Sequence, residues 1–443
     1  MDIRITPRRL TGLVKVPASK SHTIRQLFIA SLAGGLTKIY NPLDCYDTLS
    51  CLSACRELGA NITSSCEEDD NIFWNVQGVN SFKNQFDLYK TSDTSINIDV
   101  GNSGTTLYLA LAIAGLQSNN INFTGDEQIQ KRSAAPLLDA LAGLGVQVQS
   151  KNGCAPISIK GPWKGGKVSI SCPTSQYLSA LLIAAPVAPS GLVTEIDVPL
   201  LNEKPYVDMT LSYLKAHDIP FEAANDYSHF VIPGGSLWKI LPIIKPVPAD
   251  FSSAAFPAAA AAITGGPVTL PGLDLQDTQG DKFFFEMLSE MGCDVSWNGE
   301  NKSITVSREG ALRGKTFDLN ATPDLLPAAA VTAAFAEGDT TLFNVANARI
   351  KETDRISVMA GELAKLGVDC TELPDGIVIH GKGKIRPLSG DVLINGHGDH
   401  RVVMAFSVAA LGSPVPFVIT TAESAAVTFP GFFKKVTGVD FLS

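Results

Sequence analysis

Charged residues gather in one short stretch of the chain, residues 345–355, which reads VANARIKETDR. It carries ionisable side chains of both signs, namely Arg349, Lys351, Glu352, Asp354 and Arg355. A charge run of this kind commonly coats an exposed helix. The other interpretation is that the cations hold an anionic ligand while a carboxylate moves protons. The stretch alone leaves both interpretations open.

Cations elsewhere favour the anion-binding interpretation. Six of them lie at predicted helix starts or in the adjoining loops: Lys20, Arg25, Arg132, Lys351, Arg355 and Arg401. The N–H groups and the positive dipole end of a helix attract anions, and Lys or Arg side chains strengthen this attraction. One shared anionic ligand explains the pattern better than six unrelated surface positions do.

Neutral and acidic residues complete the candidate chemistry. The turn GNSGTT at 101–106 lacks the Walker and GxGxxG patterns, so we predict no nucleotide site, but its backbone N–H groups suit a small anion. The segment TSQ at 174–176 offers neutral hydrogen-bond partners. Asp324 and Glu352 are best placed for proton transfer. For Asp324 the alternative is a helix cap before LLPAAAVTAAF.

The elements that position these residues recur six times. Each copy has a polar cluster, an Ala-rich apolar helix, a Gly or Ser turn and a β-branched strand. The helices are predicted within 16–35, 101–115, 174–191, 250–266, 322–338 and 398–412, spaced roughly 74 residues apart. A helix that is apolar all round is a core element. We therefore expect six buried helices in closed α/β modules.

A second type of helix lies between the buried ones. Four of these helices end in a hydrophobic residue and a glycine: Leu58-Gly59, Leu144-Gly145, Met291-Gly292 and Leu366-Gly367. Glycine after the last helical turn is the usual left-handed cap. The third module has Asp218 in that place, so we expect a weaker cap there.

Composition excludes several classes of protein. The 443 residues carry a net charge of -9 and a pI near 5.2, so there is no basic excess to bind nucleic acid. Residues 3–16 alternate like a strand and lack the apolar core of a signal peptide, and no apolar run is long enough to span a membrane. A cytoplasmic protein is expected. The eight cysteines show no CxxC spacing. His397 and His400 are the only close pair of histidines, and no helix with a carboxylate ligand accompanies them, so we predict no metal site.

Proline marks a crossing between two domains. Residues 238–250, WKILPIIKPVPAD, alternate proline with apolar residues, which prevents a regular helix or central strand. Three modules lie on each side. We predict a discontinuous domain I at 1–19 and 245–443 and a domain II at 20–244, joined by two connections that form a hinge.

Taken together, the motifs resemble one family along nearly the whole chain. They are SKSHTIR, DVGNSGTT, TGDEQIQKRSAAPLLDAL, TSQYLSALLIAAP, KPYVDMTL, DFSSAAF, QGDKFFFEML, IKETDRI and GDHRVVMAFSVAAL. Their order is that of the 5-enolpyruvylshikimate-3-phosphate synthases. The sibling family that uses UDP-N-acetylglucosamine usually has Lys-Asn where this chain has Lys20-Ser21, which favours the shikimate family.

The resemblance implies two inside-out α/β domains, each of three repeated α/β units, with a hinge between them. It implies that domain I is the phosphoenolpyruvate half and domain II the shikimate 3-phosphate half. No metal or organic cofactor is implied, and the partners are the two small-molecule substrates. A monomer is expected, because the site lies within one chain.

The resemblance also implies a role for individual residues. Shikimate 3-phosphate is expected at Lys20, Ser21, Arg25, Thr174, Ser175, Gln176, Asp324, Asn347 and Lys351. Phosphoenolpyruvate is expected at Lys20, Gly104, Arg132, Gln176, Arg355 and Arg401. Asp324 is expected to take the proton of the attacking 5-hydroxyl, and Lys20 or Glu352 to protonate the methylene carbon.

The chain departs from the family pattern at four positions. Val427 stands where the family has Lys, Glu203 where it has Ser beside the shikimate phosphate, and Tyr108 and Gln130 replace frequent arginines. Each change removes positive charge or adds negative charge. They motivate two alternatives: an enolpyruvyl transferase with a different acceptor, and a diverged binding paralogue with little turnover.

Overall fold

The chain folds into two compact units, seen in a computed structural model that describes residues 1–66, 72–79, 95–241, 246–388 and 390–439. Unit 1 comprises Met1–Pro17 and Pro248–Ser443, and unit 2 comprises Ala18–Val247. The chain therefore passes from one unit to the other twice. The sequence places the first boundary after residue 19, and in the structure it follows Pro17. The predicted boundary between 244 and 245 touches positions outside the described residues.

Unit 2 contains three sheets in its described residues, with strand orders β3-β5-β4, β6-β7-β9-β8 and β10-β11-β13-β12. The strands are β3 Leu36–Tyr40, β4 Asn61–Cys66, β5 Ile72–Gln77, β6 Ile96–Asp99, β7 Ile121–Thr124, β8 Gln147–Lys151, β9 Cys154–Lys160, β10 Gly166–Cys172, β11 Val193–Leu201, β12 Glu222–Ala223 and β13 His229–Pro233. The helices are α1 Lys20–Leu32, α2 Tyr46–Glu57, α3 Gly104–Ala114, η3 Ile129–Lys131, α4 Ala135–Gly143, α5 Gln176–Ala184, η4 Ala185–Val187 and α6 Lys204–Ala216.

Unit 1 repeats the design, with strand orders β2-β14-β16-β15, β17-β18-β20-β19 and β1-β22-β21. The strands are β1 Ile3–Ile5, β2 Gly12–Leu13, β14 Val268–Pro271, β15 Asp294–Asn298, β16 Ser303–Ser307, β17 Thr316–Asp318, β18 Glu337–Phe343, β19 Asp369–Leu373, β20 Gly376–Lys382, β21 Val392–Ile394 and β22 Phe417–Ile419. The helices are α7 Phe251–Thr264, η5 Gly280–Lys282, α8 Phe283–Glu290, η6 Pro323–Leu325, α9 Leu326–Ala334, η7 Ala346–Ile350, α10 Arg355–Ala364, α11 His400–Leu411, η8 Ala422–Val427 and η9 Phe433–Thr437.

The four-stranded sheets share one pattern of pairing. The first strand along the chain runs parallel to the second, and the second pairs antiparallel with the fourth, as in β6, β7 and β9. The third strand, here β8, pairs antiparallel with the fourth at the edge. The prediction of repeated α/β units is confirmed by this shared topology.

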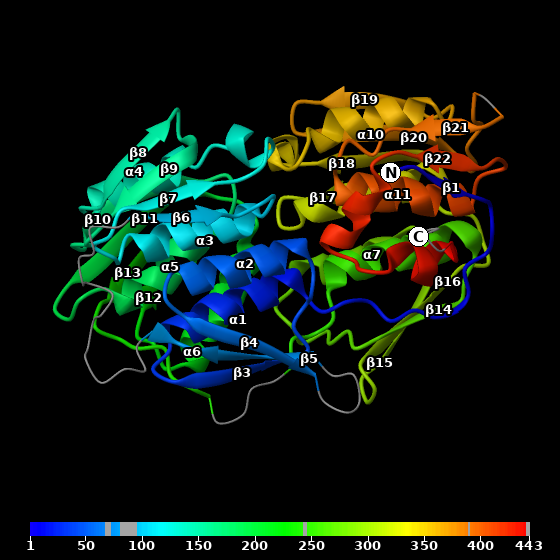
Figure 1. Cartoon of the computed structure of the whole chain (residues 1–443). Helices are drawn as coiled ribbons and strands as arrows, with labels where there is room; N and C mark the ends of the chain where they lie inside the picture. The colour runs from blue at the N-terminus through cyan, green and yellow to red at the C-terminus, as the bar shows by residue number, and fades with distance from the viewer. Residues whose placement is uncertain (67–71, 80–94, 242–245, 389, 440–443) are drawn as a thin grey trace. The chain divides into compact units, whose positions relative to one another are not determined.

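The first helix of each repeat is buried almost completely, as its all-round apolar sequence predicts. In unit 1 the helices α7, α9 and α11 contact one another, and α7 and α11 lie side by side in Figure 1. In unit 2, α3 contacts both α1 and α5. Their many alanines allow this close approach, so these helices form the centre of each unit's core.

The second helices bury one face each and end as the sequence predicts. In α10 the buried Ile356, Met359 and Leu363 recur at helical spacing. The glycine after the last turn has positive φ in each predicted case, for example 70° at Gly367, where a Cβ atom would lie 2.3 Å from the Arg386 carbonyl oxygen. Asp218 adopts the same left-handed conformation with φ 53°, which a non-glycine residue adopts at a cost.

The first segment of the chain differs from the expected continuous strand. Only Ile3–Ile5 and Gly12–Leu13 are strands, and they belong to different sheets. β1 pairs antiparallel with β22, and β2 pairs parallel with β14. Pro7 interrupts the segment, because proline has no N–H group to donate to a neighbouring strand. Within the described residues, no helix has the length and apolarity that a membrane crossing requires.

Candidate active site

The charged stretch predicted from the sequence leads into α10 of unit 1. Asp354 caps this helix, because its Oδ1 accepts hydrogen bonds from the N–H groups of Ile356 and Ser357, each at 3.1 Å. The cap places Arg355 in the first turn, where its side chain is only 1% exposed. The interpretation as an exposed charged helix is therefore wrong for Arg355.

Arg355 is surrounded by three carboxylates. Its Nε donates to Asp399 Oδ2 at 2.8 Å and its Nη2 to Asp399 Oδ1 at 3.2 Å, which makes a bidentate pair. Nη1 donates to Asp324 Oδ1 at 2.8 Å, and Nη2 also donates to Glu352. Pairs of this geometry hold a guanidinium group in one orientation.

Arg401 approaches the same carboxylate from α11. Its Nη2 donates to Asp324 Oδ2 at 2.8 Å and to Ser252 Oγ at 3.2 Å. Its backbone N–H donates to Asp399 Oδ1 at 2.8 Å, so Asp399 caps α11. The carboxylate of Asp324 thus lies between two guanidinium groups, one oxygen on each.

These contacts rule out the alternative role of Asp324 as a helix cap. Asp324 lies inside the short 3-10 helix η6, the cap position of α9 is Leu325, and no side chain caps α9 there. The side chain of Asp324 instead bonds to Arg355 and Arg401.

Electrostatics keep this carboxylate ionised. Burial acts to raise the pKa of Asp324, but the charges of Arg401, Lys351 and Arg355 together hold it well below its usual value. Burial likewise acts to raise the pKa of Asp399, and the Arg355 charge lowers it overall. Asp324 is therefore in the state that a general base requires, with cations beside it that also suit an anionic ligand.

A further carboxyl group is linked to Arg401 through Ser252. Ser252 Oγ donates to Asp281 Oδ2 and accepts from Arg401 Nη2. Asp281 is 2% exposed. Burial, followed by the charge of Asp324, raises the pKa of Asp281 to about 7. Asp281 thus takes up a proton more readily than the ionised Asp324.

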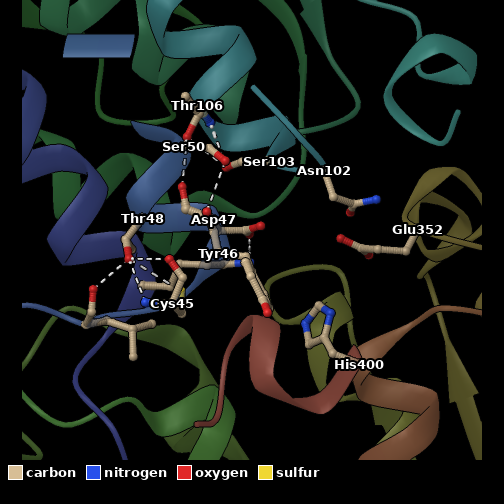
Figure 2. Close-up of polar contacts among 12 residues, drawn as sticks. Cys45, Tyr46, Asp47, Thr48, Ser50, Asn102, Ser103, Thr106, Glu352 and His400 are labelled. Carbon is tan, nitrogen blue, oxygen red and sulfur yellow. Dashed lines mark hydrogen bonds and ion pairs between the residues drawn. The ribbon is translucent and has the colours of Figure 1, made fainter. Parts of the chain in front are cut away.

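In unit 2 the first residue of α1 forms an ion pair. Lys20 Nζ lies 2.9 Å from Asp47 Oδ2 on α2, and both side chains are mostly buried. The Asp47 carbonyl oxygen accepts a hydrogen bond from Thr106 Oγ1, next to the Ser103 that caps α3 (Figure 2). The pair fixes the ammonium group of Lys20 at the start of its helix.

Arg25 is the buried cation of unit 2, with 1% exposure. It donates to neutral oxygens only among its described hydrogen bonds: Thr210 Oγ1, Ser179 Oγ, the Tyr206 carbonyl and the Ser21 carbonyl. Burial lowers the pKa of Arg25 to about 10. The group therefore stays charged at neutral pH.

The predicted phosphate-binding segment faces a carboxylate of its own chain. Glu203 Oε2 accepts hydrogen bonds from Thr174 Oγ1 at 2.9 Å, and from Ser175 N and Ser175 Oγ at 3.0 Å each. Gln176 Nε2 donates to Thr174 Oγ1 at 2.9 Å. These hydroxyl groups are therefore already engaged by Glu203.

Gly104 and Arg132 lie against each other at the start of α3. A Cβ atom on Gly104 would be 2.8 Å from Arg132 Nη1. The structure thus brings together two residues for which the family resemblance implies the same ligand. The two departures nearby are Tyr108, which is buried with its ring centroid 5.0 Å from that of Tyr177, and Gln130, whose Nε2 donates to the Gly125 carbonyl.

The predicted site residues fall into both units. Unit 1 holds Asp324, Asn347, Lys351, Glu352, Arg355 and Arg401, and unit 2 holds Lys20, Ser21, Arg25, Gly104, Arg132, Thr174, Ser175 and Gln176. Val427 of unit 1 lies in η8 and is half-buried. Across the described ranges, no three His, Cys, Asp or Glu side chains are grouped so as to hold a metal ion.

Sequence reasoning missed two carboxylates of the network: Asp399, which pairs with Arg355, and Asp281, which Ser252 links to Arg401. Asp399 stands in the motif GDHRVVMAFSVAAL and Asp281 in QGDKFFFEML, so their presence was visible but their role was not. The signal for Asp399 is an acidic residue directly before a helix that carries a functional arginine. Nothing in the local sequence of Asp281 indicates that Ser252 links it to Arg401.

Almost the whole chain is similar to proteins of one known family. The model of the family "EPSP synthase (3-phosphoshikimate 1-carboxyvinyltransferase)" matches residues 5–436. A 3-phosphoshikimate 1-carboxyvinyltransferase from Acetivibrio thermocellus is 44% identical over 100% of this chain and 98% of its own length. One from Ruminiclostridium cellulolyticum is 40% identical over 98% of each chain.

Solved structures agree with the fold. An EPSP synthase from Acinetobacter baumannii has a TM-score of 0.77 at 29% identity and covers 98% of this chain and 97% of its own. The enolpyruvyl transferase NikO from Streptomyces tendae has a TM-score of 0.73 at 18% identity, covering 99% of this chain and 97% of its own, which shows likeness of fold alone. On the family match and the curated relatives, this chain belongs to the EPSP synthase family of enolpyruvyl transferases.

Proposed function

We propose that this chain transfers the enolpyruvyl group of phosphoenolpyruvate to the 5-hydroxyl of shikimate 3-phosphate and releases phosphate. Its family and its named relatives support this activity. The observation from the chain itself that carries it is the carboxylate of Asp324 between the guanidinium groups of Arg355 and Arg401. A base beside paired cations suits the addition of an alcohol to an anionic enol phosphate.

The reaction needs one base and one acid. The 5-hydroxyl oxygen adds to C2 of phosphoenolpyruvate, its proton passes to the base, and the methylene carbon C3 takes a proton from the acid. The bond between C2 and the phosphate oxygen then breaks, and C3 returns a proton as the enol ether forms. We assign the base to Asp324, whose lowered pKa keeps it ionised, and the acid to Lys20 or Glu352.

The two arginines link substrate binding to the strength of the base. Without ligand, both guanidinium groups donate to Asp324. A phosphate or carboxylate group that binds Arg355 and Arg401 takes over part of their hydrogen bonds. The carboxylate then loses some of the stabilisation of its charged form, so its proton affinity rises when phosphoenolpyruvate is present.

The remaining assignments follow the resemblance and stay proposals. Shikimate 3-phosphate is assigned to Lys20, Ser21, Arg25, Thr174, Ser175, Gln176, Asp324, Asn347 and Lys351, and phosphoenolpyruvate to Lys20, Gly104, Arg132, Gln176, Arg355 and Arg401. The buried charge of Arg25 supports the first set, and the contact of Gly104 with Arg132 supports the second. The monomeric state and the cytoplasmic location also stay predictions.

A second acceptor is the alternative that one observation favours. Glu203 already occupies the hydroxyl groups of Thr174 and Ser175, and a carboxylate repels a phosphate group. An acceptor without phosphate avoids this repulsion. A screen of alcohol acceptors with phosphoenolpyruvate, in which shikimate 3-phosphate alone reacts, removes this alternative.

The proposed activity is tested by phosphate release from the two substrates at millimolar concentration, with the product identified by NMR. Asp324→Asn keeps the shape of the side chain and removes the base, so turnover should fall by about 10² to 10⁴. Asp318→Asn is the matched control, because Asp318 is an exposed carboxylate of the same unit. Absence of turnover in the wild type refutes the activity, and full turnover in Asp324→Asn refutes the assigned base.

A further inference from the structure

Glu203 is a buried carboxylate at an unusual place in the backbone. It is 2% exposed and directly precedes α6, with φ 59° and ψ 40°, the left-handed conformation. Its side chain makes no capping hydrogen bond to α6. It turns instead to the segment before α5, where one oxygen, Oε2, accepts from Thr174 Oγ1, Ser175 N and Ser175 Oγ.

These three donors form the pattern of an anion site. A backbone N–H and two hydroxyl groups at about 3 Å are what a phosphate oxygen uses at the start of a helix. Here the anion is part of the chain. The donors are oriented by the protein itself, so their arrangement is present before any ligand arrives.

The negative charge of Glu203 also acts on Arg25. Burial lowers the pKa of Arg25, and this effect is opposed by Tyr213, Tyr206 and, to a smaller extent, the negative charge of Glu203, which therefore lies within electrostatic reach of the guanidinium group. The described hydrogen-bond acceptors of Arg25 are all neutral. The carboxylate therefore reduces the net positive charge that Arg25 offers to a dianionic ligand.

A phosphoryl group that binds Ser175 and Arg25 is opposed by Glu203 in two ways, through occupied donors and through charge. It needs the donors that Glu203 occupies, and it is repelled by the charge of Glu203 in a region of low dielectric. An acceptor that lacks the phosphate is opposed in neither way. Release of these donors requires the Glu203 side chain, which has two methylene groups, to rotate away from Thr174 and Ser175.

We propose that Glu203 is an internal competitor of the acceptor's phosphate: it occupies Thr174 and Ser175 in the ligand-free protein, leaves them when the phosphorylated acceptor binds, and so lowers the preference for that acceptor over its unphosphorylated form. The inference rests on the proposed function, which assigns Thr174 and Ser175 to shikimate 3-phosphate, and it takes the phosphate as the group that meets them. It makes Glu203 a residue that determines specificity.

The test compares Glu203→Ser and Glu203→Gln with the wild type. Serine removes both the charge and the reach of the side chain, whereas glutamine keeps its length and an oxygen for Thr174 and Ser175 but removes the charge. Glu222→Gln, an exposed residue of β12 in the same unit, controls for the change in net charge. The readouts are KM for each substrate and kcat/KM with shikimate 3-phosphate and with shikimate.

We expect Glu203→Ser to lower KM for shikimate 3-phosphate about tenfold and to raise the ratio of kcat/KM for shikimate 3-phosphate over shikimate by a similar factor. Glu203→Gln should lie between this variant and the wild type, and KM for phosphoenolpyruvate should stay within about twofold in each. A purely structural role for Glu203 moves stability or both KM values together but not this ratio. An unchanged or lower ratio in both variants overturns the inference.

A second measurement separates this inference from the proposed function. Inorganic phosphate is titrated into each protein by calorimetry, without phosphoenolpyruvate. Binding at least about fivefold tighter in Glu203→Ser and Glu203→Gln than in the wild type and Glu222→Gln supports the competition, even if the wild type shows no turnover. Equal binding in all four proteins overturns the competition, even if the wild type is fully active. Should Glu203→Ser fail to fold, Glu203→Gln decides both measurements.

Discussion

Asp399→Asn removes one negative charge from the centre of unit 1 and leaves the shape of the side chain unchanged. Asp399 is fully buried and accepts two hydrogen bonds from Arg355, one from Thr353 Oγ1 and one from the backbone N–H of Arg401. The asparagine oxygen can still cap α11. Its amide group, however, points a donor at the guanidinium group of Arg355, which is itself only a donor.

The expected cost follows from the burial of the pair. Removing one partner of a buried ion pair costs about 3 to 5 kcal/mol when the other charge is left uncompensated, whereas Arg355 keeps Asp324 and Glu352 as partners. The cap contributes little to this difference, since Asn and Asp cap helices about equally well. We therefore expect the free energy of unfolding to fall by about 2 to 3 kcal/mol, less than for a charge left with no partner.

The chain offers a matched control in Asp354. Asp354 also caps a helix of unit 1 and also pairs with an arginine, Arg349, at 2.7 Å, but its side chain is 38% exposed. An exposed pair contributes about 0 to 1 kcal/mol, so Asp354→Asn should cost less than about 1 kcal/mol.

Both variants are compared with the wild type by urea unfolding, which is monitored by far-ultraviolet circular dichroism. The stated difference appears as a lower urea midpoint for Asp399→Asn at an unchanged slope. Equal costs for the two variants, or a cost below about 1 kcal/mol for Asp399→Asn, refute the reasoning that burial decides the strength of these pairs.

Three further predictions concern single residues. Burial raises the pKa of Asp281 to about 7, so the folded wild type keeps a proton there that the unfolded chain loses near pH 4. Wild-type stability relative to Asp281→Asn should then fall by up to about 4 kcal/mol between pH 4 and 7 in urea unfolding, and a constant difference contradicts this. Gly104→Ala places a Cβ atom 2.8 Å from the Arg132 side chain. This change should raise KM for phosphoenolpyruvate about threefold to tenfold and leave KM for shikimate 3-phosphate nearly unchanged. An unchanged KM for phosphoenolpyruvate contradicts the assignment of Arg132 to this substrate. Asp218→Gly should raise the free energy of unfolding by about 0.5 to 1 kcal/mol, because glycine adopts the observed φ of 53° without strain; a loss of stability means that the ion pair with Lys239 outweighs the strain.

Periodicity and small residues made the buried helices predictable. Within 250–266, for example, the sequence predicts a helix without a polar face, and α7 is buried along its length except at its last residue. The left-handed ends after the second helices, such as Gly367, were predictable because only the backbone at one position decides them. Both the buried helices and the left-handed helix ends depend on local sequence, and both recur in several of the repeated units.

The ionic network needed the tertiary structure. Asp399 and Arg355 lie far apart in the sequence, and only the packing of α10 and α11 brings them to 2.8 Å. The split of the first segment into β1 and β2 had the same cause, since the partners β22 and β14 come from distant parts of the chain. From its neighbours, Asp324 could be a helix cap or a base; its contacts with two arginines exclude the cap, and its role as the base stays a prediction.

The insertion of unit 2 between Pro17 and Pro248 has a consequence for synthesis on the ribosome. All of Ala18–Val247 is made before most of unit 1, so unit 2 is able to fold while the chain is still growing. The strand Ile3–Ile5, although made before unit 2, must wait for its partner Phe417–Ile419, which is made after unit 2. Until then the first strand has an unpaired edge and an apolar face, which makes it a site for chaperone binding or misassociation in the nascent protein.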